Sequence, residues 1–137
     1  MDLKKFIRSI PDYPKKGILF RDITTLIKNE KAFKETINQI VDKSKRFNVD
    51  KIAAIESRGF VFASAVSYIL DKPFILLRKK NKLPGDVHSI DFELEYGTAT
   101  IEVHKDSINE NDSVLIIDDL IATGGTAEAA SKLVEIS

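Results

Sequence analysis

The stretch that decides the fold is VLIIDDLIATGGT, at residues 114–126. It begins with four consecutive apolar residues, and so short a run is typical of a buried parallel strand. Two carboxylates, Asp118 and Asp119, follow this run, and Gly124 and Gly125 precede a segment rich in helix-forming residues. The stretch therefore predicts a strand, a loop and a helix, with an acidic pair at the carboxyl end of the strand.

The residues of this loop indicate a sugar phosphate as the ligand. Adjacent glycines let successive backbone N–H groups turn toward one small volume, and the N-terminus of the following helix adds partial positive charge, so the loop suits a phosphate. The carboxylates cannot bind that phosphate and suit a neutral group with two hydroxyls, such as a ribose diol. Open α/β folds place ligands at this end of a parallel sheet. The alternative is a buried strand that simply ends in an acidic loop with a glycine turn.

Two other predicted strands also end in polar loops. Residues 50–55 (DKIAAI) and 73–77 (PFILL) form short apolar runs. The first run is followed by Glu56, Ser57, Arg58 and Gly59, and the second by Arg78, Lys79, Lys80, Asn81 and Lys82. A run of cations usually marks a solvated loop, but this one leaves the sheet on the side where the other loops emerge. We therefore expect three loops suited to anions at one edge of the sheet.

The composition is that of one domain without a strongly charged surface. The chain has 137 residues, of which 43% are apolar, so we expect a single domain over residues 1–137. The charges of its 21 basic and 21 acidic side chains cancel. The protein therefore has no net positive charge that would attract it to nucleic acid or to an anionic membrane. The sequence has no cysteine, which excludes disulfides and thiolate metal sites and agrees with a reducing compartment. We expect a cytoplasmic protein that binds neither nucleic acid nor membrane.

Apolar spacing predicts the remaining elements. Residues 2–9 suit a short amphipathic helix, and residues 29–47 suit a longer one. Residues 89–103 alternate apolar and polar side chains with Gly97 near the middle, which predicts an antiparallel hairpin.

Residues 114–126 resemble the phosphoribosyl pyrophosphate (PRPP) signature of the type I phosphoribosyltransferases, which joins an apolar run, two acids and Thr-Gly-Gly-Thr. Further motifs resemble the adenine phosphoribosyltransferases in the order of that family, at residues 14–22 (PKKGILFRD), 57–60 (SRGF), 78–85 (RKKNKLPG) and 94–97 (LEYG). The resemblance extends over nearly the whole chain from Pro11 onward. It implies an α/β fold of the type I phosphoribosyltransferase kind, with a central, mostly parallel sheet flanked by helices. It also implies an antiparallel flap hairpin over residues 89–105 and an N-terminal hood over residues 1–28 that forms part of the base pocket.

The same resemblance implies a role for each site residue. The candidate catalytic residues are Glu95, Asp118, Asp119 and Arg58, of which the two aspartates orient the ribose diol. The phosphate of PRPP and of AMP is expected at Ala122, Thr123, Gly124, Gly125 and Thr126. Pyrophosphate is expected at Ser57, Arg58, Gly59, Arg78, Lys79 and Lys82. Adenine is expected at Leu19, Phe20 and Arg21, and Tyr96 is expected to hold the flap against the ligand. Without the resemblance, Phe20 would pass as a core residue and Glu95 as an ordinary hairpin carboxylate.

The activity that the resemblance implies is transfer of the 5-phosphoribosyl group from PRPP to adenine, giving AMP and pyrophosphate in purine salvage. Mg²⁺ is expected to bridge pyrophosphate and ribose oxygens and to keep several waters, with no direct protein ligand. A homodimer is expected because homodimers are common among the relatives.

Two other functions stay open at the level of the residues. One is a regulator that senses PRPP without catalysis, and the other is a phosphoribosyltransferase for xanthine or hypoxanthine, since only the resemblance selects adenine. The sequence contains neither GxxxxGK[ST] nor GxGxxG, which counts against a P-loop or dinucleotide-binding module.

The chain departs from the family pattern in two places. Glu56 stands where many relatives carry Asp. Relatives also continue past the helix that follows the PRPP loop, adding a strand and a tail that complete the sheet and one wall of the base pocket, whereas this chain stops at Ser137. We therefore expect the ligand sites to be present, and the activity of the shortened chain is left open.

Overall fold

The structure is a computed structural model that describes residues 1–94, 97–119 and 125–137. The chain divides into two units, Met1–Lys43 and Ser44–Ser137, and each is described by itself. Within the described residues, no helix has both the length and the apolar character that a membrane crossing requires.

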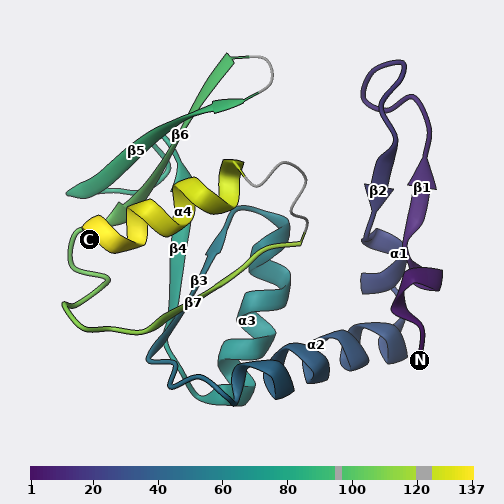
Figure 1. The fold of residues 1–137 in the computed structure, drawn as a ribbon, viewed down its shortest axis with the longest axis horizontal. Coiled ribbons are helices and arrows are strands. Elements are labelled where there is room, and N and C mark those ends of the chain that lie inside the picture. The colour runs from purple at the N-terminus through teal and green to yellow at the C-terminus, as the bar shows by residue number, and fades with distance from the viewer. Residues whose placement is uncertain (95–96, 120–124) are drawn as a thin grey trace. The chain divides into compact units, whose positions relative to one another are not determined.

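The second unit is built on a five-stranded sheet with the strand order β5-β6-β4-β3-β7 (Figure 1). Its strands are β3 (Lys51–Ile55), β4 (Phe74–Lys79), β5 (Val87–Leu94), β6 (Gly97–His104) and β7 (Val114–Ile117). The central strand β3 pairs in parallel with β4 and with β7, as the three apolar runs predict. β6 pairs antiparallel with β4 and with β5, so the predicted hairpin is confirmed and extends the same sheet. The predicted α/β fold is therefore confirmed, with a sheet whose hairpin side is antiparallel.

Two helices cover opposite faces of this sheet (Figure 1). They are α3 (Arg58–Leu70) and α4 (Gly125–Ile136). The rings of Phe60 in α3 and Phe74 in β4 meet edge to face, with centroids 5.5 Å apart. The neighbouring residue Ile75 belongs instead to the cluster that α4 covers with Ala130 and Leu133, since side chains alternate between the faces of a strand.

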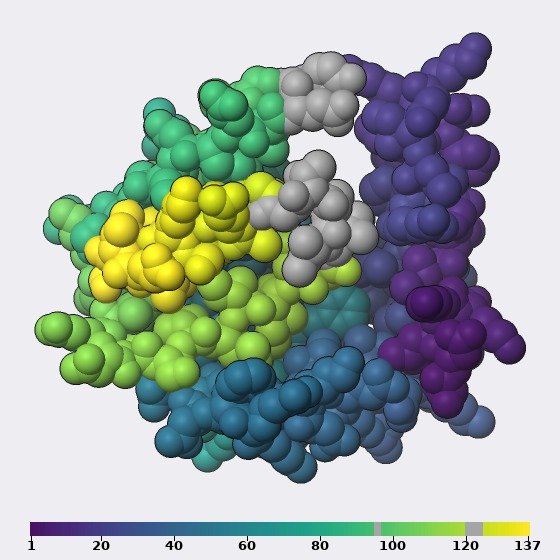
Figure 2. Space-filling model, viewed as in Figure 1, coloured from purple at the N-terminus to yellow at the C-terminus, as the bar shows by residue number. Residues whose placement is uncertain are grey.

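The cluster under α4 is the core that holds the hairpin to the parallel strands. Leu77 of β4, Val103 of β6 and Leu133 of α4 are all fully buried in it. Burial of one such side chain stabilises a fold by about 1.5–3 kcal/mol. The outer side of α4 lies at the surface beside the hairpin strands (Figure 2).

The first unit contains a two-stranded antiparallel sheet and three helical segments. They are the 3₁₀ helix η1 (Leu3–Phe6), β1 (Arg8–Ile10), β2 (Phe20–Asp22), α1 (Thr24–Ile27) and α2 (Glu30–Ser44). The helix expected over residues 29–47 is confirmed as α2. The helix expected over residues 2–9 is wrong beyond Phe6, because the backbone from Arg8 pairs with β2 instead.

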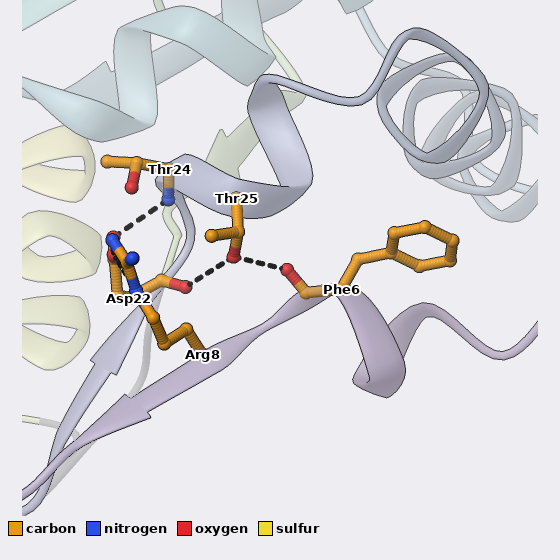
Figure 3. Close-up of polar contacts among 5 residues, drawn as sticks. All are labelled: Phe6, Arg8, Asp22, Thr24 and Thr25. Atoms are coloured by element: carbon orange, nitrogen blue, oxygen red, sulfur yellow. Dashed lines mark hydrogen bonds and ion pairs between the residues drawn. The ribbon is translucent and has the colours of Figure 1, made fainter.

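Asp22 is the residue that ties β1, β2 and α1 together (Figure 3). Its side chain is buried and accepts hydrogen bonds from Arg8 Nε at 3.0 Å and from the Thr24 backbone N–H at 2.9 Å. The Thr25 hydroxyl donates to the carbonyl of Phe6, so η1 is attached to the same junction. The junction explains why residues 8–10 adopt a strand that their own apolar spacing does not predict.

The Asp22 carboxyl is strongly acidic in this setting. Hydrogen bonds from the Thr24 hydroxyl and backbone N–H, and then from Arg8, lower its pKa from 3.8 to about 2. A lowered pKa of an acid stabilises the fold above the unfolded pKa, and this contribution is lost as the pH falls through the folded value.

We expect Asp22→Asn to lower the thermal unfolding midpoint at pH 7, because the neutral amide loses the charge-assisted bonds to Arg8 and Thr24. The difference from the unsubstituted chain should shrink as the pH falls from about 4 to about 2, where the carboxyl itself becomes protonated. Thermal melts across this range measure the effect. The same substitution at the exposed Asp106 is the control, and an equal pH dependence for both variants would contradict the assignment.

Candidate active site

The parallel pairing brings the three predicted anion loops to one edge of the sheet. Ile55 of β3 lies opposite Leu77 of β4, and Ala54 of β3 lies opposite Ile117 of β7. The loops that begin at Glu56, Arg78 and Asp118 therefore leave the sheet side by side, as the sequence predicts.

Arg58 and Asp119, which come from two of these loops, form an ion pair. Arg58 Nε lies 3.0 Å from Asp119 Oδ2, and 43% of the Arg58 side chain but only 9% of the Asp119 side chain is exposed. The pair joins a residue expected to bind pyrophosphate to one expected to bind the ribose diol. Arg58, Gly59, Asp118 and Asp119 are called the strand-end cluster below.

Asp118 is the member of this cluster whose acidity is most altered. Its half-buried carboxyl accepts a hydrogen bond from the Asp119 backbone N–H at 2.8 Å. Burial, followed by the neighbouring Asp119 carboxyl, raises the pKa of Asp118 to about 6, against the opposing effects of the Asp119 N–H and Arg58. A strongly shifted carboxyl next to a specific charge partner is typical of a functional site.

Gly59 gives the cluster its close packing. It is buried at the start of α3, and a Cβ there would lie 3.1 Å from the carbonyl oxygen of Ile117 and 3.5 Å from Asp118 Oδ1. The absence of a side chain at Gly59 lets the N-terminus of α3 approach the end of β7. This contact sets the distance between the first and third loops.

Glu56 links the first loop to the second. Its Oε1 accepts the backbone N–H of Lys79 at 2.7 Å and Arg78 Nε at 3.3 Å. Burial raises the pKa of Glu56, but the Lys79 N–H and then Arg78 outweigh that effect and leave the pKa below its usual value. The peptide bond between Glu56 and Ser57 is cis. Ser57 precedes α3 without a capping hydrogen bond from its side chain.

The basic residues at the end of β4 and directly after it differ in their exposure. Arg78 is half-buried against Glu56, whereas Lys79, Lys80 and Lys82 are exposed. A hydrogen bond from the Lys82 N–H to the Lys79 carbonyl, at 3.2 Å, closes a turn between them. Residues 78–82 are called the basic loop below.

The other predicted site residues lie in separate parts of the chain. Gly125 and Thr126 begin α4, while Ala122, Thr123, Gly124, Glu95 and Tyr96 lie outside the described residues. Leu19, Phe20 and Arg21 belong to the first unit.

In that unit, Phe20 is partly buried, and its ring meets Tyr13 edge to face at 5.2 Å. Leu19 is 51% exposed, and the Arg21 guanidinium donates to the hydroxyl of Ser9.

Among the residues that the structure describes, two cavities have linings separate from the strand-end cluster. One of about 380 Å³ is lined in part by Asp86 and Asp106. The other, of about 300 Å³, is lined in part by Glu93 of β5 and by Gly125 and Glu128 of α4, so it borders the start of the helix where the 5-phosphate is expected. Carboxylates outnumber lysines in both linings.

Glu102 of β6 contacts the loop after β4, although the sequence did not single it out. Its side chain is buried, and it accepts the Asn81 backbone N–H of the basic loop at 2.9 Å. Ile101 and Val103 lie in the core, so alternation along the strand predicts that Glu102 between them faces the opposite side of the sheet. The sequence does not predict that Glu102 is buried on that side as well.

Comparison with known proteins decides the family. The model of the phosphoribosyl transferase domain matches residues 22–136. The chain belongs to the phosphoribosyltransferase family. It is 80% identical over 137 residues to an adenine phosphoribosyltransferase of Pelagibacter ubique, covering 100% of this chain and 78% of that protein. It is also 53% identical over 135 residues to an adenine phosphoribosyltransferase of Methylobacillus flagellatus, covering 98% of this chain and 77% of that protein.

Solved structures of phosphoribosyltransferases share the fold. The adenine phosphoribosyltransferase of Thermoanaerobacter pseudethanolicus superposes with a TM-score of 0.94 at 47% identity, covering 98% of this chain and 78% of that chain. The enzyme of Giardia lamblia, solved in complex with 9-deazaadenine, gives a TM-score of 0.94 at 40% identity, covering 98% and 75% of the two chains. The expected membership of the type I phosphoribosyltransferases and their fold is therefore confirmed.

We expect Asp118→Asn to stabilise this phosphoribosyltransferase at pH 7. An acid whose pKa is raised by folding costs stability above that pKa, and the cost disappears below the unfolded pKa. The gain should be on the order of 1 kcal/mol once solvent screening of this half-buried group is allowed for. It should fade as the pH falls from about 6 to about 4, because the native carboxyl then becomes neutral.

Urea unfolding at a series of pH values measures the gain. Asp106→Asn is again the exposed control. A loss of stability in Asp118→Asn at pH 7 would contradict the direction assigned to the Asp118 pKa.

Proposed function

We propose that the chain transfers the 5-phosphoribosyl group of PRPP to adenine and releases AMP and pyrophosphate, a reaction of purine salvage. The observation that carries this proposal is the strand-end cluster, which joins a cation and two carboxylates beside a basic loop. The choice of adenine is supported by the relatives, which are named adenine phosphoribosyltransferases, and by the complex of the Giardia lamblia enzyme with 9-deazaadenine. None of these names supports a non-catalytic regulator or a different purine base.

The two aspartates suit the ribose. Ionised Asp118 and Asp119 accept hydrogen bonds from the two ribose hydroxyls and place negative charge close to the sugar. A purine nitrogen attacks the anomeric carbon as the bond to pyrophosphate breaks, so positive charge develops on the sugar ring. Carboxylates that are already fixed beside that charge stabilise it without reorganisation.

The cations suit the departing pyrophosphate. Arg58 exchanges its contact with Asp119 for pyrophosphate, with Ser57 and Gly59 at the N-terminus of α3. The exposed lysines Lys79 and Lys82, with Arg78 behind them, add charge from the second loop. The reaction then depends on alignment and on charge placement, since no covalent intermediate is required.

The remaining ligand contacts rest on the sequence. Residues 122–126 bind the 5-phosphate at the N-terminus of α4, and Leu19, Phe20 and Arg21 bind adenine. Glu95 exchanges a proton with the purine, and Tyr96 holds the flap against the ligand, so that water is excluded from the reactive sugar.

Magnesium is expected to arrive with PRPP. The described residues include no group of three or more His, Cys, Asp or Glu side chains placed to hold a metal ion. Oxygen atoms of Asp118 and Asp119 would accept hydrogen bonds from the waters of a hydrated ion, which would neutralise part of the pyrophosphate charge. The homodimer and the cytoplasmic location stay predictions from the sequence.

Incubation with PRPP, Mg²⁺ and each purine base in turn tests the proposal. We expect AMP and pyrophosphate with adenine, and no nucleotide with hypoxanthine, guanine or xanthine. Chromatography of the products measures the outcome. Nucleotide from another base would refute the adenine assignment, and PRPP binding without turnover on any base would favour the regulator.

We expect the double variant Asp118→Asn/Asp119→Asn to lower kcat/KM for PRPP by at least about a hundredfold, because the developing charge loses its fixed partners. Steady-state kinetics measure the loss, and Asp106→Asn should keep the original rate. Unchanged affinity and rate in the double variant would remove the basis for the proposed diol site.

A further inference from the structure

A buried carboxylate outside the strand-end cluster has no role in the reaction as proposed. Glu102 of β6 is only 7% exposed. An isolated buried charge is costly, so its partners indicate what it does. One oxygen accepts the backbone N–H of Asn81 at 2.9 Å, and the other accepts the hydroxyl of Ser89 at 2.7 Å.

Glu102 stays charged in this position. The hydrogen bond from Ser89, then the Asn81 N–H, lowers its pKa against the opposing effect of burial, and Lys80 adds a smaller attraction. The chain therefore keeps a buried negative charge beside the basic loop. Its direct hydrogen-bond partners are a main-chain N–H and a hydroxyl, not a lysine ammonium.

The basic loop is held at its backbone from two sides. Glu56 accepts the Lys79 N–H at 2.7 Å and Glu102 accepts the Asn81 N–H at 2.9 Å. At the second of these points Asn81 has a φ of 67°, in the left-handed region that costs energy for a residue other than glycine. The two carboxylates thus hold the main chain on either side of Lys80.

The same arrangement leaves the lysine ammonium groups available. Across residues 1–94, 97–119 and 125–137, no ion pair involves Lys79, Lys80 or Lys82. A carboxylate that binds main-chain N–H groups shapes the loop without occupying the cations that an anionic ligand needs. His104, two residues further along β6, bonds the carbonyl of Pro84 at 2.7 Å and holds the chain beyond the loop.

We propose that Glu102 is a positioning residue for the basic loop, which it holds together with Glu56 in the geometry that binds the pyrophosphate of PRPP. This inference rests on the proposed function. It also links two parts of the site, because Ser89 lies on β5 and pairs across the hairpin with Glu102. One buried carboxylate therefore connects the hairpin strands to the loop.

The substitution Glu102→Gln tests the role, because Gln has the same shape but only one acceptor oxygen. Its amide N–H₂ can donate to the Ser89 hydroxyl oxygen while its oxygen accepts the Asn81 N–H, but this acceptor is neutral, so the loop is held by a weaker hydrogen bond than the carboxylate provides. We expect pyrophosphate to bind about tenfold more weakly in isothermal titration calorimetry, with and without Mg²⁺. KM for PRPP should rise similarly, while KM for adenine changes less than about twofold.

The direction of the change in pyrophosphate affinity distinguishes a positioning role of Glu102 from a purely electrostatic one. If Glu102 acted only through its field, neutralising it would remove a repulsive neighbour and pyrophosphate would bind more tightly. Glu110→Gln is the matched control, since it removes the same charge from an exposed site in the loop that follows β6. Hydrogen exchange at the Asn81 amide gives a second readout, and it should speed up in Glu102→Gln but not in Glu110→Gln.

The outcomes of this experiment are distinct. Weaker pyrophosphate binding together with faster Asn81 exchange supports the inference. Unchanged or tighter binding in Glu102→Gln, with normal binding by the unsubstituted chain, would overturn the inference alone. Failure of the unsubstituted chain to bind pyrophosphate at all would overturn the proposed function instead. Should Glu102→Gln fail to fold, Ser89→Ala removes only the hydroxyl partner, and it must then weaken pyrophosphate binding in the same direction.

Discussion

The parallel pairing of β3 with both β4 and β7 is the constraint on which the site depends. Parallel strands point the same way, so their carboxyl ends reach one edge of the sheet. Three loops from distant parts of the chain meet there, and Arg58 can reach Asp119 at 3.0 Å. The buried cluster of β3, β4, β6 and α4 holds the strands in this register, so the core determines the geometry of the charged groups.

The charged side chains at this edge of the sheet make two kinds of contact. Glu56 and Glu102 bind main-chain N–H groups and shape the basic loop, while the exposed lysines face solvent. Burial, and then the adjacent Asp119 carboxyl, raises the pKa of Asp118, so keeping Asp118 ionised costs stability. Proteins commonly keep such unfavourable arrangements at functional sites and compensate for them elsewhere. Arg58, which pairs with Asp119, opposes part of this cost.

The hairpin β5–β6 has two structural roles. Ile101 and Val103 of β6 are buried in the core under α4, so the hairpin is part of the main sheet. The residue between them, Glu102, turns to the other face and contacts the basic loop. The alternation of side chains along one strand thus joins core packing to the shape of a ligand loop. The hairpin therefore contributes to the shape of the basic loop as well as to the sheet.

Local sequence patterns predicted most of the strands and helices. Short apolar runs predicted β3, β4 and β7, and alternation predicted the hairpin. The acids and glycines after β7 predicted a sugar-phosphate site, which stays a prediction. Such signals work because they depend on burial and backbone preference within a few residues. The sequence did not predict β1, because the strand at Arg8 forms only through its pairing with Asp22. The sequence also gave no indication that the Glu102 side chain is buried, because the Asn81 N–H that it binds lies in the connection between β4 and β5. Contacts between segments distant in the chain are fixed only when the sheet assembles, and they decided these two features.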